Sequence, residues 1–236
     1  MVTPGQDPAA TERSRGYEEV ETMRLIDMRT WYRREHFTFF NALDHPHFSM
    51  CANVDATAFC SFVRSNGYSL TISMVYVIAR SSNAIPEFRY RIRGDQVVEH
   101  DVVNPGFSVL VDDDLFSFCP VEYTEDFSEF ARRAAESVAS VRAQLDLGAN
   151  SDRDDVLYMS PIPWVSFTSF SHPMQLHPAD SIPRFAWGKH FEESGRVKMP
   201  LNVQGHHALM DGIHVGRFYE AVQDCLHRPE AVLGAV

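Results

Sequence analysis

Apolar side chains three and four positions apart predict helices in five parts of the chain. These are residues 31–43, 55–66, 69–84, a long segment from about 126 to 147, and the stretch from 212 onward. Thr30, Asp55 and either Thr124 or Asp126 are typical N-cap residues at three of the expected starts. The segment 69–84 carries many β-branched residues, so a buried strand is the alternative reading there.

Shorter apolar runs bounded by turn residues predict strands. The expected strands are residues 48–54, 88–92, 96–102, 107–111, 116–121, 164–170, 185–190 and 196–203. Gly94-Asp95 and Ser194-Gly195 are hairpin turn signals, and residues 148–155 are expected to form a polar loop. Helices and strands follow each other irregularly, with several hairpins, which predicts an α+β fold with a mixed β-sheet flanked by helices.

The length and composition favour one globular domain. The chain has 236 residues, and from residue 17 to 236 we find no repeat and no low-complexity linker. Residues 1–16 are polar, and we expect a flexible leader there rather than a secretory signal. No run approaches the ~20 apolar residues of a membrane span, and the four cysteines lack CxxC spacing. These features predict a cytoplasmic protein with no membrane partner.

The net charge of −11 argues against a nucleic-acid partner, because such binders need a basic surface to displace counterions. A small anionic ligand held by a local basic patch remains compatible with that charge. Phenylalanine accounts for 17 residues, enough to line an apolar pocket.

Two adjacent histidines stand between the last expected strand and the last expected helix. Histidine suits general base catalysis because its pKa lies near neutrality. Asp211 follows His207 by four residues and can brace the corner. A metal site built from His206, His207, Asp211 and His214 is the alternative. Adjacent strand residues point to opposite faces, so we expect no metal.

Residues 200–218 read PLNVQGHHALMDGIHVGRF and closely resemble the active-site signature of the classical trimeric chloramphenicol acetyltransferases. The wider acyltransferase superfamily shares only the pattern His-x-x-x-Asp-Gly. Three further segments resemble the same family in order and spacing: WYRREHF at 31–37, PEFR at 86–89 and PWVSFTSF at 163–170. The resemblance spans roughly residues 20–228 and implies the two-layer sandwich of the CoA-dependent acyltransferases.

The resemblance implies an O-acetyltransferase that moves the acetyl group of acetyl-CoA to the primary hydroxyl of chloramphenicol, and so confers resistance to the antibiotic. His207 matches the general base of the family and Asp211 its structural aspartate. The partner of Asp211 would be Arg33, with Arg34 as the alternative. Ser160 lies three residues before Pro163, as in the family, and matches the serine that donates a hydrogen bond to the oxyanion.

The family also implies binding residues and an assembly. The acceptor pocket is apolar, and this chain would supply it with Phe39, Phe40, Phe48 and Phe107. The cosubstrate acetyl-CoA carries phosphates, for which the basic candidates are Lys189 and Lys198, while His190 falls where an aromatic ring covers the adenine. Members of the family are homotrimers whose active sites lie between subunits.

Departures from the family pattern keep two alternatives open. Asp44-His45-Pro46-His47 is more polar than the corresponding family loop, Ala186 replaces a threonine, and Met210 replaces a cysteine. The first alternative is acetylation of a different hydroxylated small molecule. The second is a non-catalytic homologue that binds the antibiotic.

Overall fold

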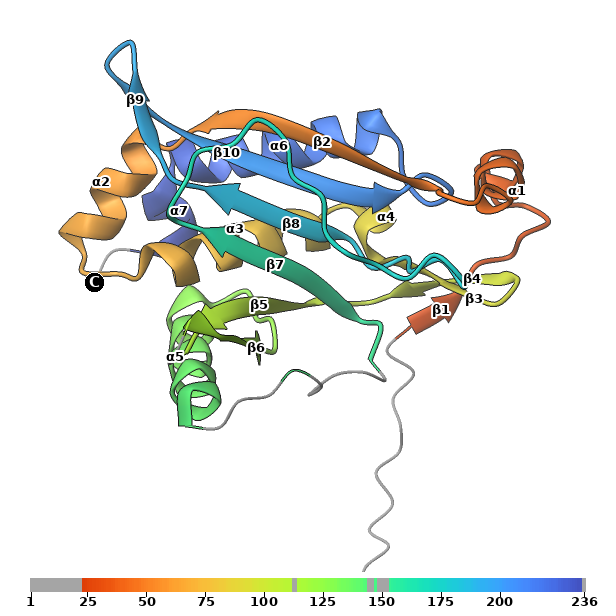
Figure 1. Cartoon of the computed structure of the whole chain (residues 1–236), viewed down its shortest axis with the longest axis horizontal. Helices are drawn as coiled ribbons and strands as arrows, with labels where there is room; N and C mark the ends of the chain where they lie inside the picture. Colours follow the sequence, from red (N-terminus) through yellow and green to blue (C-terminus); the bar gives the residue numbers. More distant parts are fainter. Residues whose placement is uncertain (1–22, 112–113, 144–146, 148–152, 235–236) are drawn as a thin grey trace, which may run out of the picture.

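A mixed β-sheet forms the centre of the computed structural model, which describes residues 23–111, 114–143, 147 and 153–234. The main path of this seven-stranded sheet has the order β2-β10-β8-β7-β5-β6 (Figure 1). Its strands are β2 (His47–Asp55), β5 (Asn104–Leu110), β6 (Phe116–Pro120), β7 (Val156–Ile162), β8 (Arg184–Gly188), β9 (Phe191–Glu193) and β10 (Arg196–His206). Strand β7 runs parallel to β5 and β8, and the other pairs are antiparallel.

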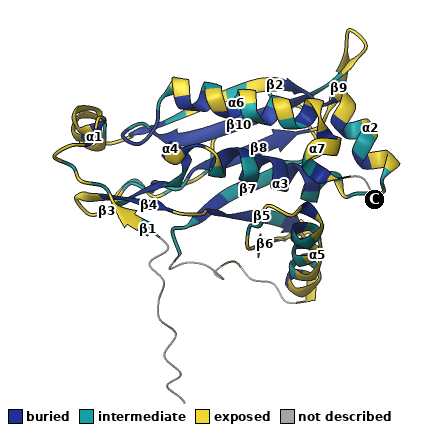
Figure 2. Ribbon diagram, turned by 180° about the vertical axis from the view of Figure 1, so that it is seen from behind, coloured by how far each residue is buried: buried dark blue, intermediate teal, exposed yellow. Residues whose placement is uncertain are grey.

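Helices cover one face of this sheet and leave the other to a loop. The covering helices are α2 (Thr57–Ser65), α3 (Leu70–Asn83), α5 (Phe127–Ala143), α6 (Gly212–His227) and α7 (Pro229–Leu233). Figure 2, seen from the helix side, shows the buried residues concentrated between these helices and the strands. Alternate strand residues such as Phe107, Leu157 and Phe185 point into this core.

The opposite face of the sheet is crossed by the long loop between β7 and β8 (Figure 1). Ser49 on β2 donates a hydrogen bond to the Phe170 carbonyl at 3.0 Å, and the His172 amide donates to Gln204 of β10 at 2.8 Å. These contacts hold the loop against β2 and β10. We call this side the open face.

A smaller sheet lies beside the large one and carries the N-terminal elements. It has the order β1-β4-β3, with β1 (Met23–Leu25), β3 (Tyr90–Arg93) and β4 (Gln96–His100). Helix α1 (Arg34–Asn41) follows β1, and the short helix α4 (Pro86–Arg89) leads into β3. Trp31, Phe37, Tyr90 and Leu209 belong to a second apolar cluster, which joins this part to the corner after β10.

The predicted α+β fold with a mixed sheet and flanking helices is confirmed, and residues 70–83 form the helix rather than the alternative strand. Ser69 Oγ accepts the Ile72 N–H at the start of this helix. The first helix begins at Arg34, later than expected, with Arg33 and not Thr30 at its N-cap.

The predicted strand at residues 164–170 is wrong, and the strand of this region was not predicted. Residues 164–170 form no strand but begin the loop over the open face, and the strand is β7, at Val156–Ile162. The alternation of apolar and hydroxyl residues at 164–170 belongs to a loop whose Trp164 is exposed. The predicted leader (1–16), part of the loop 148–155 and the helix end near 147 lie wholly or partly outside the described residues. None of the helices in the described ranges is long and apolar enough to cross a bilayer.

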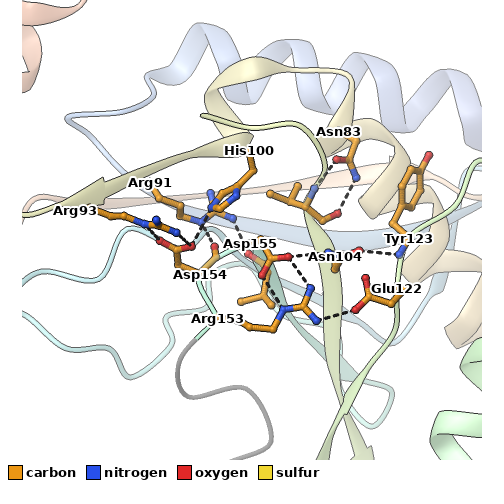
Figure 3. A network of polar contacts seen from close by, with 12 residues as sticks. Asn83, Arg91, Arg93, His100, Asn104, Glu122, Tyr123, Arg153, Asp154 and Asp155 are labelled. Atoms are coloured by element: carbon orange, nitrogen blue, oxygen red, sulfur yellow. Dashed lines mark hydrogen bonds and ion pairs between the residues drawn. The ribbon is translucent and has the colours of Figure 1, made fainter. Parts of the chain in front are cut away.

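A polar network ties the small sheet to the start of β7 (Figure 3). Arg91 is fully buried and donates hydrogen bonds to the backbone carbonyls of Phe88, Tyr90, Asp154 and Val156, at 2.5–3.0 Å. Burial lowers the pKa of Arg91 to about 10. Because one guanidinium satisfies carbonyls of β3 in the small sheet and β7 in the large sheet, together with those of Phe88 and Asp154, it fixes the position of one sheet on the other.

Replacing Arg91 should therefore destabilise the fold strongly. Arg91→Met keeps the aliphatic stem but leaves buried carbonyls without donors, and we expect a loss of about 3 kcal/mol or more in the free energy of unfolding. Arg93→Met removes a more exposed arginine that pairs with Asp154, and it should cost less than about 1 kcal/mol. Urea unfolding measures both, and equal losses would contradict this role of Arg91.

Candidate active site

A tight corner joins the end of β10 to the start of α6 and presents His207. The His207 amide donates to the Pro46 carbonyl at 2.8 Å, and the amides of Leu209 and Met210 donate to the His206 carbonyl. A Cβ at Gly205 would lie 2.4 Å from the Met210 sulfur, so any larger residue there would force the Met210 side chain to move. Met210, which departs from the family pattern, thus packs directly against the strand end.

Two aromatic rings hold the His207 imidazole. The Phe40 ring stacks on it with centroids 3.8 Å apart and planes 3° apart, and the Phe48 ring lies 4.9 Å away. Nδ1 of His207 is shielded from solvent and lies 3.0 Å from Oδ1 of Asp211, but it is not aligned for a hydrogen bond. The side chain is 33% exposed, so the imidazole is fixed on one side and accessible on the other.

An ion pair between Arg33 and Asp211 braces the corner. Arg33 is 3% exposed, and its Nη1 and Nη2 donate to the two carboxylate oxygens of Asp211 at 2.5 and 3.2 Å. Nη2 also donates to the His207 carbonyl at 3.2 Å. Partial burial by itself would raise the pKa of Asp211, but the guanidinium outweighs this effect and lowers it. Arg34, the alternative partner, is exposed and pairs with Glu35.

The backbone of Asp211 has a second set of partners that we did not predict from the sequence. The Asp211 amide donates to Nδ1 of His214 at 2.9 Å. Nε2 of His214 lies 3.3 Å from Oε1 of Glu87, and the Tyr32 hydroxyl donates to the same oxygen at 2.5 Å. The sequence signal that could have pointed to these partners is Glu87, a charged residue between Pro86 and Phe88.

His206, unlike its neighbour His207, is buried and closed off from solvent. It is 1% exposed, its Nδ1 accepts the Ala208 amide at 3.2 Å, and the His47 ring lies 5.0 Å away. Burial and the neighbouring His47 lower the pKa of His206 to about 4, so the imidazole is neutral. Nowhere in the described residues do three histidine, cysteine, aspartate or glutamate side chains form a metal-binding group.

Ser160 and His207 lie far apart within one chain. Ser160 on β7 pairs with Ala186 on β8, which pairs with Asn202 on β10. Ser160 is thus two strands away from β10, at the level of Asn202, and His206 lies four residues further along β10. The spacing between strands and the rise per residue together place Ser160 about 16 Å from the corner. One chain does not bring these two candidates together.

Three of the four candidate pocket phenylalanines gather near His207. Phe39 is 64% exposed and lies 5.1 Å from Phe40, which with Phe48 contacts the His207 imidazole. Phe107 is instead 1% exposed and part of the core between the sheet and the helices. Its side chain therefore lies on the opposite side of the sheet from the open face.

The candidate residues for acetyl-CoA lie toward the other end of β10. Lys198 is eight residues before His206, about 26 Å along the strand, and its Nζ lies 3.4 Å from Asp55. Lys189 and His190 are exposed and directly follow β8. In one chain these three residues are nearer to the level of Ser160 than to that of His207.

Comparison with solved structures first defines the class of protein. A solved chloramphenicol acetyltransferase matches with a TM-score of 0.82 and 27% identity over 86% of this chain and 99% of that one. The dihydrolipoamide acetyltransferase of Azotobacter vinelandii matches with a TM-score of 0.63 at 20% identity, over 98% of this chain, and shares the fold. The fold is that of the CoA-dependent acyltransferases, which implies an acyl-CoA cosubstrate.

Sequence comparison then defines the family. The sequence profile of the chloramphenicol acetyltransferases matches residues 22–223. A chloramphenicol acetyltransferase of a Klebsiella species is 32% identical over 199 residues, covering 84% of this chain and 91% of that protein. That of Clostridium perfringens is 29% identical over 214 residues. The chain belongs to the chloramphenicol acetyltransferase family and is an acyltransferase of that family.

Buried neutral histidines should make the fold sensitive to mild acid. The folded pKa of His206 and of His172 is about 4, each lowered mainly by burial, against about 6.5 when unfolded. Between these values the unfolded state binds more protons, so stability should be full above pH 6.5 and fall toward pH 4. Each such histidine can contribute a slope of up to about 1.4 kcal/mol per pH unit.

His206→Asn tests this slope, because an amide oxygen can replace Nδ1 as acceptor but cannot take up the proton. Urea unfolding between pH 7 and pH 5 should show a shallower loss of stability than in the unsubstituted protein. The exposed His36→Asn serves as the control and should keep the original slope. Parallel curves for His206→Asn and the unsubstituted protein would refute the assignment.

Proposed function

We propose that this protein transfers the acetyl group of acetyl-CoA to the primary hydroxyl of chloramphenicol, with His207 as the general base. The observation that carries the proposal is the His207 imidazole, which is partly exposed and packs against the rings of Phe40 and Phe48. The corner that holds it is braced by Arg33 and Asp211. The resemblance to enzymes named for this reaction, at 32% and 29% identity for the two relatives described above, supports the choice of acceptor.

The geometry of His207 indicates which nitrogen acts. Nδ1 is buried and faces the Asp211 carboxylate, which favours a proton on Nδ1 and leaves the lone pair on Nε2. Nε2 would take the proton of the acceptor hydroxyl as its oxygen attacks the thioester carbonyl. The tetrahedral oxyanion then collapses, the carbon–sulfur bond breaks, and the thiolate of CoA takes the proton from His207.

Ser160 would donate a hydrogen bond to the oxyanion, and for this the active site must draw on two subunits. About 16 Å separate Ser160 from the corner within one chain, so a second copy has to bring its own Ser160 to His207. A homotrimer with three equivalent sites between subunits satisfies this requirement, since each subunit gives His207 to one site and Ser160 to another.

The open face around Ser160 supports such an interface. Tyr158 lies two residues before Ser160 on the same face of β7, and a line of rings runs from it through Phe118 to Phe116 on β6. Phe116 and Leu110 are about half exposed in the single chain. Large apolar side chains exposed together are typical of a surface that another chain or a ligand covers.

The departures from the family pattern support a second candidate, a different hydroxylated acceptor. Asp44 and His45 are exposed in the loop before β2, close to Phe48. Ala186, which replaces the family threonine, is the cross-strand neighbour of Ser160. A panel of hydroxylated acceptors separates the two candidates, because a clear preference for chloramphenicol excludes the second. Tight binding of chloramphenicol without turnover would favour the non-catalytic homologue.

Removing the base should abolish most of the activity. His207→Ala should lower the rate of CoA thiol release with acetyl-CoA and chloramphenicol by ~10²–10⁴-fold, because a positioned base contributes that much. The exposed His36→Ala on α1 is the matched control and should keep the full rate. An inactive unsubstituted protein, or full activity of His207→Ala, would rule out the proposed mechanism.

Mixing two inactive variants tests the site between subunits. Ser160→Ala should lower the rate by ~10²–10³-fold through loss of an oxyanion donor. When His207→Ala and Ser160→Ala subunits are unfolded together and refolded at equal concentrations, about a quarter of the sites should pair an intact His207 with an intact Ser160. Activity should therefore return to about a quarter of the original. No recovery in a mixture that has reassembled would place each site within one chain.

A further inference from the structure

We propose that Glu87 is a positioning residue for the catalytic corner and acts through His214 on Asp211. Glu87 touches none of the reacting groups, and its role is to keep the proton of His214 on Nε2. The kinetic part of this inference rests on the proposed acetyl transfer by His207, whereas the structural part does not.

The backbone contact of His214 fixes which ring nitrogen carries the proton. Its Nδ1 accepts the Asp211 amide at 2.9 Å, so Nδ1 must carry a lone pair and the proton of the neutral ring sits on Nε2. His214 occupies the third position of α6, where a glutamate or glutamine in a capping box reaches back to the N-cap amide. A histidine can take this place only in the one tautomer.

The carboxylate of Glu87 selects that tautomer. Oε1 of Glu87 lies 3.3 Å from Nε2 of His214, and Glu87 is 6% exposed. A carboxylate only accepts hydrogen bonds, so it favours a proton on Nε2 and disfavours a lone pair there. The Tyr32 hydroxyl donates to the same oxygen at 2.5 Å and holds it in place.

A carboxylate at position 87 excludes an orientation that a glutamine amide would allow. A glutamine could accept from Tyr32 and His214, but it could also turn its amide and donate to Nε2. That orientation would stabilise the tautomer in which Nδ1 faces Asp211 with a proton, and the hydrogen bond to the Asp211 amide would be lost. Burying a carboxylate is costly, and the hydrogen bond from Tyr32 and the contact with Nε2 of His214 offset part of that cost. The carboxylate, unlike an amide, excludes the alternative tautomer.

The contacts of Asp211 connect Glu87 and His214 to His207. Asp211 is held from two sides, with its carboxylate on Arg33 and its amide on His214. Arg33 also holds the His207 carbonyl, so a shift of Asp211 changes the position of the imidazole. Tyr32 and Arg33 are consecutive residues before α1. Tyr32 binds Glu87 on one side of the corner, and Arg33 binds the Asp211 carboxylate on the other.

Kinetics of two variants test the inference, with a control elsewhere on the protein. We expect Glu87→Ala to lower kcat by ~10- to 100-fold with the KM values for both substrates within twofold, because a small misplacement of the base affects chemistry and not binding. Glu87→Gln keeps an acceptor and should recover part of kcat. Glu99→Ala removes another buried carboxylate, 4% exposed and paired with Arg24 and Arg89, and should leave kcat unchanged even if stability falls.

A spectroscopic readout separates this inference from the proposed function. In protein labelled with [15N]histidine, the ring nitrogens of His214, assigned with a His214→Gln variant, should show a protonated Nε2 and an unprotonated Nδ1. In Glu87→Ala this pattern should shift toward the mixture of tautomers found in free histidine.

The outcomes distinguish the two claims. An unsubstituted protein without acetyl transfer defeats the proposed function, and the nitrogen shifts still decide the role of Glu87. A kcat for Glu87→Ala equal to that for Glu99→Ala, or a His214 pattern that does not change in Glu87→Ala, overturns the positioning role.

Discussion

The ion pair between Arg33 and Asp211 is the interaction on which the corner around His207 depends. Arg33 is almost fully buried, and loss of Asp211 would leave its guanidinium without the carboxylate that it pairs with, which would be strongly destabilising. Its bidentate contact with Asp211 and its bond to the His207 carbonyl therefore determine where the chain must turn after β10. The backbone at His207 has little freedom once these bonds are made.

The two faces of the large sheet are covered by different parts of the chain. The face under the helices holds the apolar core, and the open face carries polar side chains beneath the loop between β7 and β8. The corner at the end of β10 presents consecutive histidines in two environments: His206 is buried and neutral, and His207 is partly exposed. A single-residue step thus separates a structural imidazole from one suited to catalysis.

Much of the fold and part of the candidate site could be predicted from the sequence. The helices around residues 57–65, 70–83 and 127–143 have strong local patterns, and the family motif led to the Arg33–Asp211 pair. Strand β7 was missed because its apolar run ends in prolines at 161 and 163, which are atypical of a central strand.

Other features depend on contacts between distant segments and have no local signal. Alternation along a strand does not say which face is covered, so Phe107 could not be assigned to the core from sequence. Glu87 and His214 each occur singly in apolar surroundings, 127 positions apart, and only the packing of α4 against α6 brings them together. The separation of Ser160 from His207 follows from the strand order, which the sequence does not show.

The distance along the chain between Arg33 and Asp211, 178 residues, bears on how the protein folds. Closing a loop of this length costs much conformational entropy for one contact, and the pairing of β2 with β10 brings the same two regions of the chain together. During synthesis, nearly the whole domain must leave the ribosome before the corner can form. The corner around His207 thus requires nearly the whole domain, and a chain that stops before α6 has the strands of the large sheet but lacks His214, which holds the Asp211 amide.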